Sequence, residues 1–366
     1  MITISLCMIV KNEEKTLPNC LKSVEGLADE IIIVDTGSSD KTRETARKFT
    51  KHVYDFQWID DFSAARNFAF KKATCDYLMW LDADDVLLEE DLRAFLKLKA
   101  MFDPKVDVVM MRYHTAFDEH GRPTFSYYRE RLIKRSYHYR WMEPVHEYIS
   151  TPGANIITTQ IAVTHTKKSG GETSGRNIRI YEARINAGET LSARGMYYYA
   201  RELQDHGRYK DAIAWFTRFL ESRLGWAEDN IGACGALSDC YLKEGQKERS
   251  LYALLRSFQY DTPRAEVCAK IGYHFKDLGN YRLAAYWFEH ILSLVYPSES
   301  WGFVQREYWG YIPCLELCVC YDKLGEREKA AFYNEKAAQY KPGSSAVKHN
   351  REYFKSVNRV IEQAHR

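Results

Sequence analysis

Strand-like runs of β-branched residues recur through the first half of this 366-residue chain and disappear after about Ser192. Before that point they alternate with segments whose apolar residues recur at helical spacing, and after it only helical segments remain. The chain is also long enough to bury two separate hydrophobic cores. We therefore expect two domains of different class, over residues 1–190 and 191–366.

The first domain is expected to be an open, mostly parallel α/β sheet. The run Glu30-Ile31-Ile32-Ile33-Val34-Asp35 is typical of a parallel strand covered on both faces. Further strands are predicted over residues 2–10, 52–56 and 76–81. Helices are predicted between them, including one over residues 63–73 that begins at Ser63. This alternation favours a sheet with right-handed crossovers.

Polar side chains follow three of these predicted strands. Lys11-Asn12-Glu13 follows the first, Asp35 ends the second, and the acidic pair Asp82 and Asp84 follows the strand over 76–81. In open α/β sheets, ligands bind beyond the carboxyl ends of the strands. Carboxylates there can hold a divalent metal, which neutralises the charge on a departing diphosphate. The alternative, a solvated loop or helix start, is disfavoured because three strands direct polar groups to one edge.

These residues resemble the family 2 glycosyltransferases of the GT-A fold, a Rossmann-like nucleotide-sugar-binding sheet. More narrowly, they resemble the branch with helical repeats after the catalytic domain, including the sublancin-type peptide S-glycosyltransferase group. The resemblance covers roughly the first half of the chain. Its motifs are Ser5-Leu6-Cys7-Met8-Ile9-Val10-Lys11-Asn12-Glu13, Glu30-Ile31-Ile32-Ile33-Val34-Asp35-Thr36-Gly37-Ser38-Ser39-Asp40, Asp61-Phe62-Ser63-Ala64-Ala65-Arg66-Asn67, Trp80-Leu81-Asp82-Ala83-Asp84 and Val145-His146-Glu147.

The resemblance implies roles for the donor side of a site. Val10 to Glu13 would border the nucleoside and Asp35 would contact the base, as a carboxylate can accept from an imide N–H of uracil. Arg66 would approach the nucleotide, because arginine matches phosphate oxygens with a planar set of donors. Its alternative is an exposed helix residue paired with Asp60 or Asp61. Asp82 would contact the ribose or the metal, and Asp84 would be the principal ligand of Mg or Mn.

The acceptor side is expected in the segment Trp141 to Glu147. An inverting transfer needs one base that deprotonates the acceptor as the anomeric carbon is attacked. Glu147 is the first candidate, Glu143 and His146 are rivals, and a purely structural Glu147 is the alternative. Many relatives have glycine nearer His146, whereas this chain has Glu143-Pro144.

His165 ends the predicted strand Ile161-Ala162-Val163-Thr164. As a neutral imidazole it could complete the metal shell, as a late histidine does in many enzymes of this fold. A structural histidine is the alternative. The Gly-rich, basic segment over residues 167–172 is expected to close over a diphosphate.

The second half carries four copies of one local signature. A glycine is followed five residues later by a small residue, at Gly207/Ala212, Gly245/Ser250, Gly279/Ala284 and Gly325/Ala330. The glycines are 38, 34 and 46 residues apart. A period near 34 is the tetratricopeptide pattern, so the second domain is predicted to be an all-α tetratricopeptide-like repeat.

The repeats are rich in aromatic clusters that could be mistaken for sugar-stacking platforms. Because the rings lie at helix-packing positions, they are expected to form repeat cores instead. The clusters are Tyr197-Tyr198-Tyr199, Trp215-Phe216 and Tyr286-Trp287-Phe288. The concave surface of stacked repeats could bind a peptide or protein acceptor, or form a homodimer interface.

Charge and composition restrict the partners and the cellular compartment that are expected for this chain. The net charge of +2 gives no global field for nucleic acid or an anionic membrane. No signal peptide and no membrane span of roughly 20 apolar residues is recognisable. Nine scattered cysteines without paired spacing favour reduced thiols in the cytosol over a zinc site. A cytoplasmic location is therefore expected.

The predicted function is metal-dependent, inverting transfer of a sugar from a nucleotide-sugar, with UDP as the expected nucleotide. The acceptor is expected to be a Ser, Thr or Cys side chain of a peptide or protein, with a cell-surface saccharide as the alternative. A nucleotidyltransferase is disfavoured because no Gly-rich, basic phosphate loop follows the first strand. A non-catalytic repeat scaffold that senses nucleotide is the third reading, and the retention of Asp35, Arg66, Asp82 and Asp84 argues against it.

Overall fold

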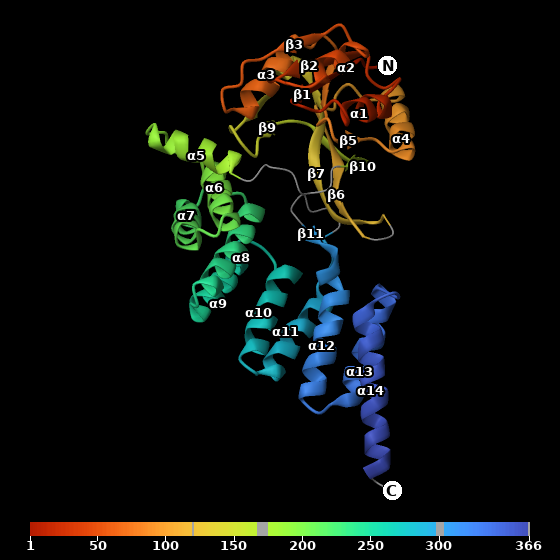
Figure 1. Cartoon of the computed structure of the whole chain (residues 1–366), viewed down its shortest axis with the longest axis vertical. Helices are drawn as coiled ribbons and strands as arrows, with labels where there is room; N and C mark the ends of the chain where they lie inside the picture. Colours follow the sequence, from red (N-terminus) through yellow and green to blue (C-terminus); the bar gives the residue numbers. More distant parts are fainter. Residues whose placement is uncertain (119–120, 167–174, 298–303, 365–366) are drawn as a thin grey trace. The chain divides into compact units, whose positions relative to one another are not determined.

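The computed structural model of the chain describes residues 1–118, 121–166, 175–297 and 304–364, with side chains described up to residue 356. The chain divides into two compact units, and the first ends at Thr190 where the second begins at Leu191. Figure 1 shows an α/β unit containing the N-terminus and an all-helical unit ending at the C-terminus.

The first unit alternates strands and helices up to α4 and is then dominated by longer strands. Its strands are β1 (Ile4–Val10), β2 (Glu30–Asp35), β3 (Val53–Asp55), β4 (Tyr77–Trp80), β5 (Asp85–Val86), β6 (Val108–Phe117), β7 (Pro123–Lys134), β8 (Arg140–Met142), β9 (Tyr148–Ser150) and β10 (Ile156–His165). Its helices are α1 (Leu17–Ser23), α2 (Thr42–Arg47), α3 (Phe62–Lys72), α4 (Glu89–Ala100) and α5 (Arg176–Asn186), with a 3₁₀ turn at Arg135–Tyr137.

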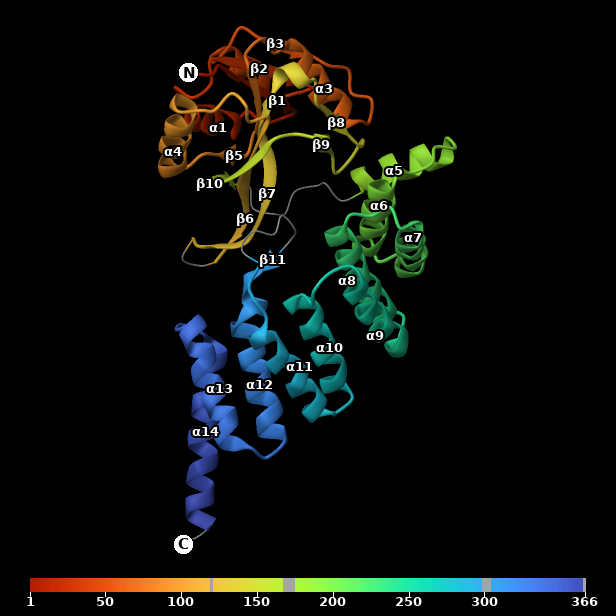
Figure 2. The ribbon, with the colours of Figure 1, turned by 180° about the vertical axis from the view of Figure 1, so that it is seen from behind.

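The central sheet has the strand order β3-β2-β1-β4-β7-β6-β10-β5. The first four strands are parallel, as predicted. The expectation of a mostly parallel sheet is nevertheless wrong beyond β4, because β7 runs antiparallel to both β4 and β6. The long β6 and β7 strands, seen from two sides in Figures 1 and 2, were not predicted. Since β10 is parallel to β6, it runs in the same direction as β1 and β4.

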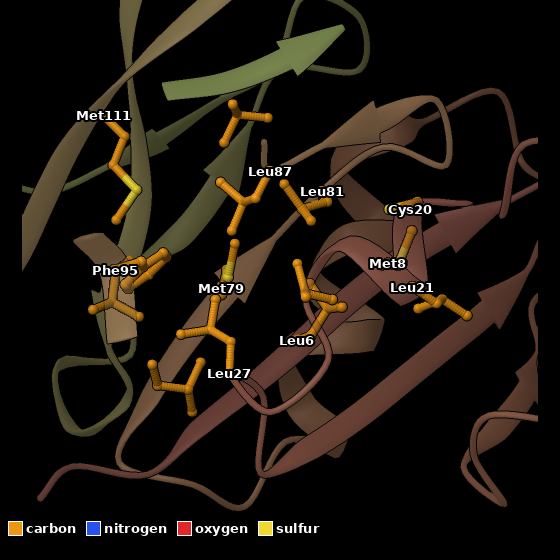
Figure 3. Packing of buried hydrophobic residues seen from close by; sticks show 14 of the residues in the cluster. Leu6, Met8, Cys20, Leu21, Leu27, Met79, Leu81, Leu87, Phe95 and Met111 are labelled. Atoms are coloured by element: carbon orange, nitrogen blue, oxygen red, sulfur yellow. The ribbon is translucent and has the colours of Figure 1, made fainter. Parts of the chain in front are cut away.

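Both faces of the parallel strands are buried, as the β-branched pattern of β2 predicts. Alternate residues of β1, such as Leu6 and Met8, pack with Leu21 of α1 and Phe95 of α4, and Figure 3 shows this cluster. The opposite face packs against α3 and the β8–β9 hairpin. The sheet is therefore the middle layer, and the carboxyl ends of β1, β2, β4 and β10 lie along one edge.

Helix α3 begins one residue earlier than predicted. Its N-cap is Asp61, whose side chain accepts a hydrogen bond from the backbone N–H of Ala64 at 2.9 Å. Ser63 donates its hydroxyl to the same Asp61 oxygen at 2.7 Å. Ser63 thus supports the capping aspartate rather than opening the helix itself.

The second unit is built from consecutive helices. They are α6 (Ala193–Asp205), α7 (Tyr209–Ser222), α8 (Ala227–Lys243), α9 (Lys247–Arg256), α10 (Ala265–Asp277), α11 (Tyr281–Ser293), α12 (Tyr311–Lys323), α13 (Arg327–Tyr340) and α14 (Ser345–Ala364). Short elements join some of them, namely the 3₁₀ turns Ser257–Gln259 and Arg306–Trp309 and the strand β11 (Val304–Gln305). The longest glycine spacing, 46 residues, corresponds to the insertion between α11 and α12.

The glycine signature behaves as the tetratricopeptide pattern predicts. Each of its four glycines follows the first helix of a pair and has a φ angle between 71° and 82°, a conformation that L side chains rarely adopt. The small residues five positions later are all buried. Where α10 meets α11, a Cβ on Gly272 would lie 2.8 Å from the Phe288 ring, so the two helices pack closely. These are tetratricopeptide-like repeats.

The aromatic clusters pack inside the repeats, with one exception. Tyr197, Tyr198 and Tyr199 are buried, as are Phe216 and Phe288. Tyr286, by contrast, is 60% exposed, so its assignment to a core was wrong. No helix of the described residues is long and apolar enough to cross a membrane.

Candidate functional site

The segment after β1 is held to the segment after β2 by side-chain to backbone hydrogen bonds. Asn12 has a left-handed backbone, with φ of 57°. Its side-chain oxygen accepts from the N–H of Ser39 at 2.8 Å, and its own N–H donates to the Ser38 hydroxyl at 2.9 Å. Of the residues predicted to border a nucleoside, Val10 is buried, Glu13 is half-buried, and Lys11 and Asn12 are exposed.

Asp35 ends β2 with one carboxylate oxygen engaged and one unpaired. Oδ1 accepts from the N–H groups of Gly37 and Ser38, at 3.0 and 2.9 Å, and from Nε of Arg43 at 2.8 Å. Oδ2 is buried and has no hydrogen-bond partner within the described ranges. Burial acts to raise the pKa of Asp35, but the hydrogen bonds from Ser38, Arg43 and Gly37 outweigh it and hold the pKa below its usual value. A buried acceptor, held as an anion, therefore lies at this edge of the sheet.

Arg66 joins the acidic segment after β4 to the loop after β8. Its Nη2 donates to Asp82 Oδ1 and its Nε to Glu147 Oε1, both at 2.7 Å. The Arg66 side chain is 8% exposed and pairs with Asp82 and Glu147, so the alternative of an exposed arginine paired with Asp60 or Asp61 is wrong. Burial opposes its charge, but Asp82 and Glu147 raise its pKa above the usual value. Its Nη1 has no partner among the residues that the structure describes.

Two tryptophans enclose this arginine. The guanidinium carbon of Arg66 lies 5.1 Å from the ring of Trp80 and 4.7 Å from that of Trp141. Burial raises the pKa of Asp82, whereas Arg66 lowers it, and the net shift is downward. The guanidinium end of the ion pair thus lies in an aromatic cage, whereas the Asp82 side chain is 37% exposed.

The acceptor-side segment is fastened to α3. Asn67 donates to the carbonyl of Trp141 at 2.9 Å and accepts from its N–H at 3.0 Å. Glu143 and His146 both have left-handed backbones, with φ of 73° and 54°. Such conformations cost on the order of 1–3 kcal/mol each and are often found at functional loops. Arg66 and Asn67, adjacent on α3, therefore fix both ends of this segment.

Asp84, Asp85 and His165 bring one ligand atom each to within 4.8 Å of one another. His165 Nδ1 lies 3.5 Å from oxygens of both aspartates. Hydrogen bonding to Asp85 is the main reason that the pKa of His165 is raised. The donor set of carboxylate oxygens and imidazole nitrogen fits a divalent cation. Of the predicted metal residues, Asp84 and His165 belong to this group, whereas Asp82 is paired with Arg66.

Four residues of the site were not predicted, namely Asp85, Tyr113, Arg129 and Arg131. Asp85 directly follows Asp84, and its position in the acidic run was a readable signal. The two arginines lie on β7, which was not predicted, so nothing in the sequence brought them to this edge. The segment over residues 167–172, expected to close over a diphosphate, lies outside the described residues.

Arg129 and Arg131 complete a cluster of guanidinium groups around Trp80. Their guanidinium carbons lie 4.7 and 3.8 Å from the ring of Trp80. Arg129 also donates to the Glu147 carbonyl at 3.3 Å. Arg129 and Arg131 are themselves paired with Glu130 and Asp85, so these guanidinium groups fix the carboxylates and the Trp80 ring at this edge.

Comparison with known proteins agrees with this geometry. Residues 5–154 match the family model described as Glycosyl transferase family 2. A TPR repeat-containing protein of Synechococcus elongatus is 37% identical over 151 residues, which cover 41% of this chain and 36% of that protein. The prophage-derived glycosyltransferase SunS of Bacillus subtilis is 26% identical over 233 residues, covering 60% of this chain and 54% of SunS. The matches thus span about half or less of these two relatives.

A poly-beta-1,6-N-acetyl-D-glucosamine synthase of Staphylococcus epidermidis is 34% identical over 114 residues, which cover 29% of this chain and 27% of that protein. The family model spans β1 to β9, the part of the sheet that carries the acidic turn, Arg66 and Glu147. The first half of the chain therefore matches the glycosyl transferase family 2 model over residues 5–154 and is followed by tetratricopeptide-like helical repeats.

Proposed function

We propose that the chain is a metal-dependent glycosyltransferase that moves a sugar from a nucleotide-sugar, with UDP as the nucleotide, to a side chain of a peptide or protein. The proposal is supported most directly by the edge at which β1, β2, β4 and β10 end. A buried, unpaired carboxylate oxygen of Asp35 and the acidic turn with His165 lie at this same edge. A nucleoside diphosphate needs a base acceptor and a cation site of this kind.

On the donor side, each residue has a distinct task. Asp35 Oδ2 accepts a hydrogen bond from the base, and residues 10–13 border the nucleoside. Asp84 and His165 are the proposed ligands of Mg or Mn, with Asp82 beside them towards the ribose. Bound there, the cation supplies charge neutralisation for the departing diphosphate. Arg66 orders Asp82 through the 2.7 Å ion pair and contributes positive charge near the nucleotide.

On the acceptor side, an oxygen or sulfur forms a bond to the anomeric carbon as the bond from that carbon to the diphosphate oxygen breaks. We assign the proton of the acceptor to Glu147, with His146 as a second catalytic candidate and Glu143 as a rival. The pairing of Glu147 with Arg66 links this base to the donor side. Inversion at the anomeric carbon follows from the family resemblance.

The acceptor class is supported by two features. The repeats supply an extended surface of the kind that binds peptides, and the sequence resembles the peptide S-glycosyltransferase group. A saccharide acceptor is the second candidate, favoured by the likeness to a poly-beta-1,6-N-acetyl-D-glucosamine synthase. A homodimer through the repeats is an alternative use of their surface. Eight of the nine free cysteines are buried, which fits the proposed cytoplasmic setting.

Transfer from labelled UDP-hexoses to peptides containing Ser, Thr or Cys, followed by mass spectrometry with Mn²⁺ present, tests this function. We expect a mass increase of one hexose on peptides with the wild-type chain and none with Asp84→Ala. Sugar added only to oligosaccharides would replace the peptide acceptor with the saccharide. Failure to consume any UDP-sugar, in a chain that is folded, would contradict the donor assignment.

Glu147→Gln tests the base. A hydroxyl needs its proton removed in the transition state, which contributes about 10²–10⁴-fold, whereas a thiol ionises more readily. We therefore expect Glu147→Gln to slow transfer to Ser or Thr peptides about a hundredfold or more and transfer to Cys peptides much less. Equal losses for both acceptors would point to Glu147 as an ordering residue. Glu143→Gln tests the rival base in the same assay, and a larger loss in Glu143→Gln than in Glu147→Gln would move the assignment to Glu143.

A further inference from the structure

Both carboxylate oxygens of Asp85 accept hydrogen bonds from described protein groups. Its side chain is fully buried. Oδ1 accepts from the hydroxyl of Tyr113 at 2.8 Å, and Oδ2 accepts from the N–H of Asp82 at 3.1 Å and from Nη1 of Arg131 at 3.2 Å. Both oxygens therefore face protein donors. Asp84 and His165, by contrast, are 13% and 27% exposed and can meet a ligand from outside.

The charge beside Asp85 also opposes a cation at its oxygens. Arg131 is fully buried, and its guanidinium carbon lies 3.8 Å from the ring of Trp80 and 4.5 Å from that of Tyr113. It also donates to the carbonyl of Trp80 at 3.1 Å, so it cannot move away without losing these contacts. A divalent ion at Oδ2 would approach a fixed positive charge in a region of low polarity, where repulsion is strong.

The hydroxyl of Tyr113 connects Asp85 to His165. A tyrosine hydroxyl has one proton, and an ionised carboxylate can only accept. The proton of Tyr113 therefore goes to Asp85, and its oxygen, 3.2 Å from Nδ1 of His165, acts there as an acceptor. Oxygens of Asp84 and Asp85 also lie 3.5 Å from Nδ1. With the Tyr113 oxygen and Asp85 on its buried side, Nδ1 is placed to donate its hydrogen, and in that tautomer the neutral ring leaves the lone pair of Nε2 available.

The backbone of the acidic turn is also held in place, by pairing with the end of β10. Asp85 pairs with His165 where β5 meets the end of β10. The carbonyl of Asp84 accepts from both the N–H and the hydroxyl of Thr166, at 2.8 and 2.7 Å. The turn and the end of β10 thus form one rigid unit, with Asp85 on its buried side.

We propose that Asp85, Tyr113 and Arg131 are positioning residues that present the carboxylate of Asp84 and Nε2 of His165 to a divalent cation, and that Asp85 is not itself a ligand. This inference rests on the proposed metal-dependent function. Residues behind metal ligands set the tautomer and orientation of those ligands, and their loss commonly costs about 10–100-fold in metal affinity.

The test is Mn²⁺ binding to the full chain, measured by electron paramagnetic resonance of free Mn²⁺. Tyr113→Phe removes only the hydroxyl, and we expect it to weaken Mn²⁺ binding about tenfold or more. If Asp85 were a ligand, the same variant would free its Oδ1 and leave binding unchanged or tighter, which would overturn the inference. Tyr128→Phe is the matched control, because it removes another buried hydroxyl of the sheet, bonded to Gln160 at 3.3 Å, away from the acidic turn. Its affinity should equal that of the wild type.

A second readout needs no variant of the acidic turn. In the metal-free chain with ¹⁵N-labelled histidine, at alkaline pH where the ring is neutral, the ring of His165 should carry its proton on Nδ1. The ¹⁵N resonances of His165 are identified as those that disappear in His165→Gln. A proton on Nε2 would overturn the inference while leaving the proposed function intact. A wild-type chain that binds no Mn²⁺ would instead contradict the metal dependence on which both depend.

Discussion

Arg66 in the α/β domain and Phe288 in the repeats are both large, buried side chains that join two elements, yet they do so in different ways. Arg66 contacts Asp82 and Glu147 through ion pairs, the second of them 81 residues away. Phe288 packs against Gly272 and Tyr273 of the preceding helix, and the Tyr273 ring lies 5.4 Å away. The repeats are thus held by short-range apolar packing, and the site by charges brought together from distant segments.

The largest expected effect on stability is in the repeats. Phe288→Ala should lower the free energy of unfolding by about 3–5 kcal/mol, because it leaves a cavity between α10 and α11. The neighbouring Tyr286→Ala is the control, since Tyr286 is 60% exposed and should cost less than about 0.5 kcal/mol. Urea denaturation measures both. Similar losses for the two variants would mean that the α10–α11 contact does not stabilise the repeats.

Arg66→Met should cost somewhat less. Removing one partner of a buried ion pair leaves the other charge uncompensated, at about 3–5 kcal/mol. Asp82 is 37% exposed and can be solvated, so we expect about 2–4 kcal/mol. Arg66→Lys keeps the charge and should recover part of this loss in urea denaturation. If Arg66→Met were as stable as the wild type, the ion pairs would not hold the segment around Glu147.

Two glycines of the repeats allow the cost of a strained backbone to be compared with the gain from better helix propensity. Gly279 has a φ of 72°, so Gly279→Ala should destabilise by roughly 1–2 kcal/mol. Gly235 lies inside α8 with nothing within 4 Å of an added Cβ, so Gly235→Ala should stabilise by about 0.4–1 kcal/mol. Thermal unfolding should show opposite signs. The same sign for both would contradict the tetratricopeptide turn at Gly279.

The smallest expected effect concerns pH and the α/β domain. Because the pKa of Asp35 is below its usual value in the folded chain, Asp35 contributes stability at neutral pH. That contribution is lost as pH falls from about 4, the unfolded value, through the folded pKa. Asp35→Asn should therefore flatten the acid side of the stability profile. An unchanged profile from pH 5 to pH 2 would show that Asp35 is not held as an anion.

The contrast between short-range and long-range contacts also explains how much could be predicted from the sequence. Gly207, Gly245, Gly279 and Gly325 end their helices as their spacing predicts, because each contact lies within one repeat. β1 to β4 were also predicted, since a β-branched run such as residues 30–35 carries its own signal. The cluster around Tyr286 did not show which of its rings would be buried, because neighbouring side chains on one helix point in different directions.

Candidate site residues could be predicted from two signals. One is a motif at the end of a recognised strand, as for Asp35, Asp84 and His165, and the other is the family resemblance, as for Arg66 and Glu147. Arg131 and Tyr113 were not predicted, because they lie on β7 and β6, whose long and partly polar strands carry weaker alternation. Their roles depend on the antiparallel pairing of β6 with β7, a contact that no local pattern specifies.

The most direct test of the account is isothermal calorimetry of the full chain against UDP and GDP, with and without Mn²⁺. We predict UDP binding that is strengthened by Mn²⁺ in the wild type and that loses this strengthening in Asp84→Ala. GDP should bind more weakly. Failure to bind UDP, or UDP binding that is the same with and without Mn²⁺, would contradict a metal-assisted nucleotide-sugar site at this edge of the sheet.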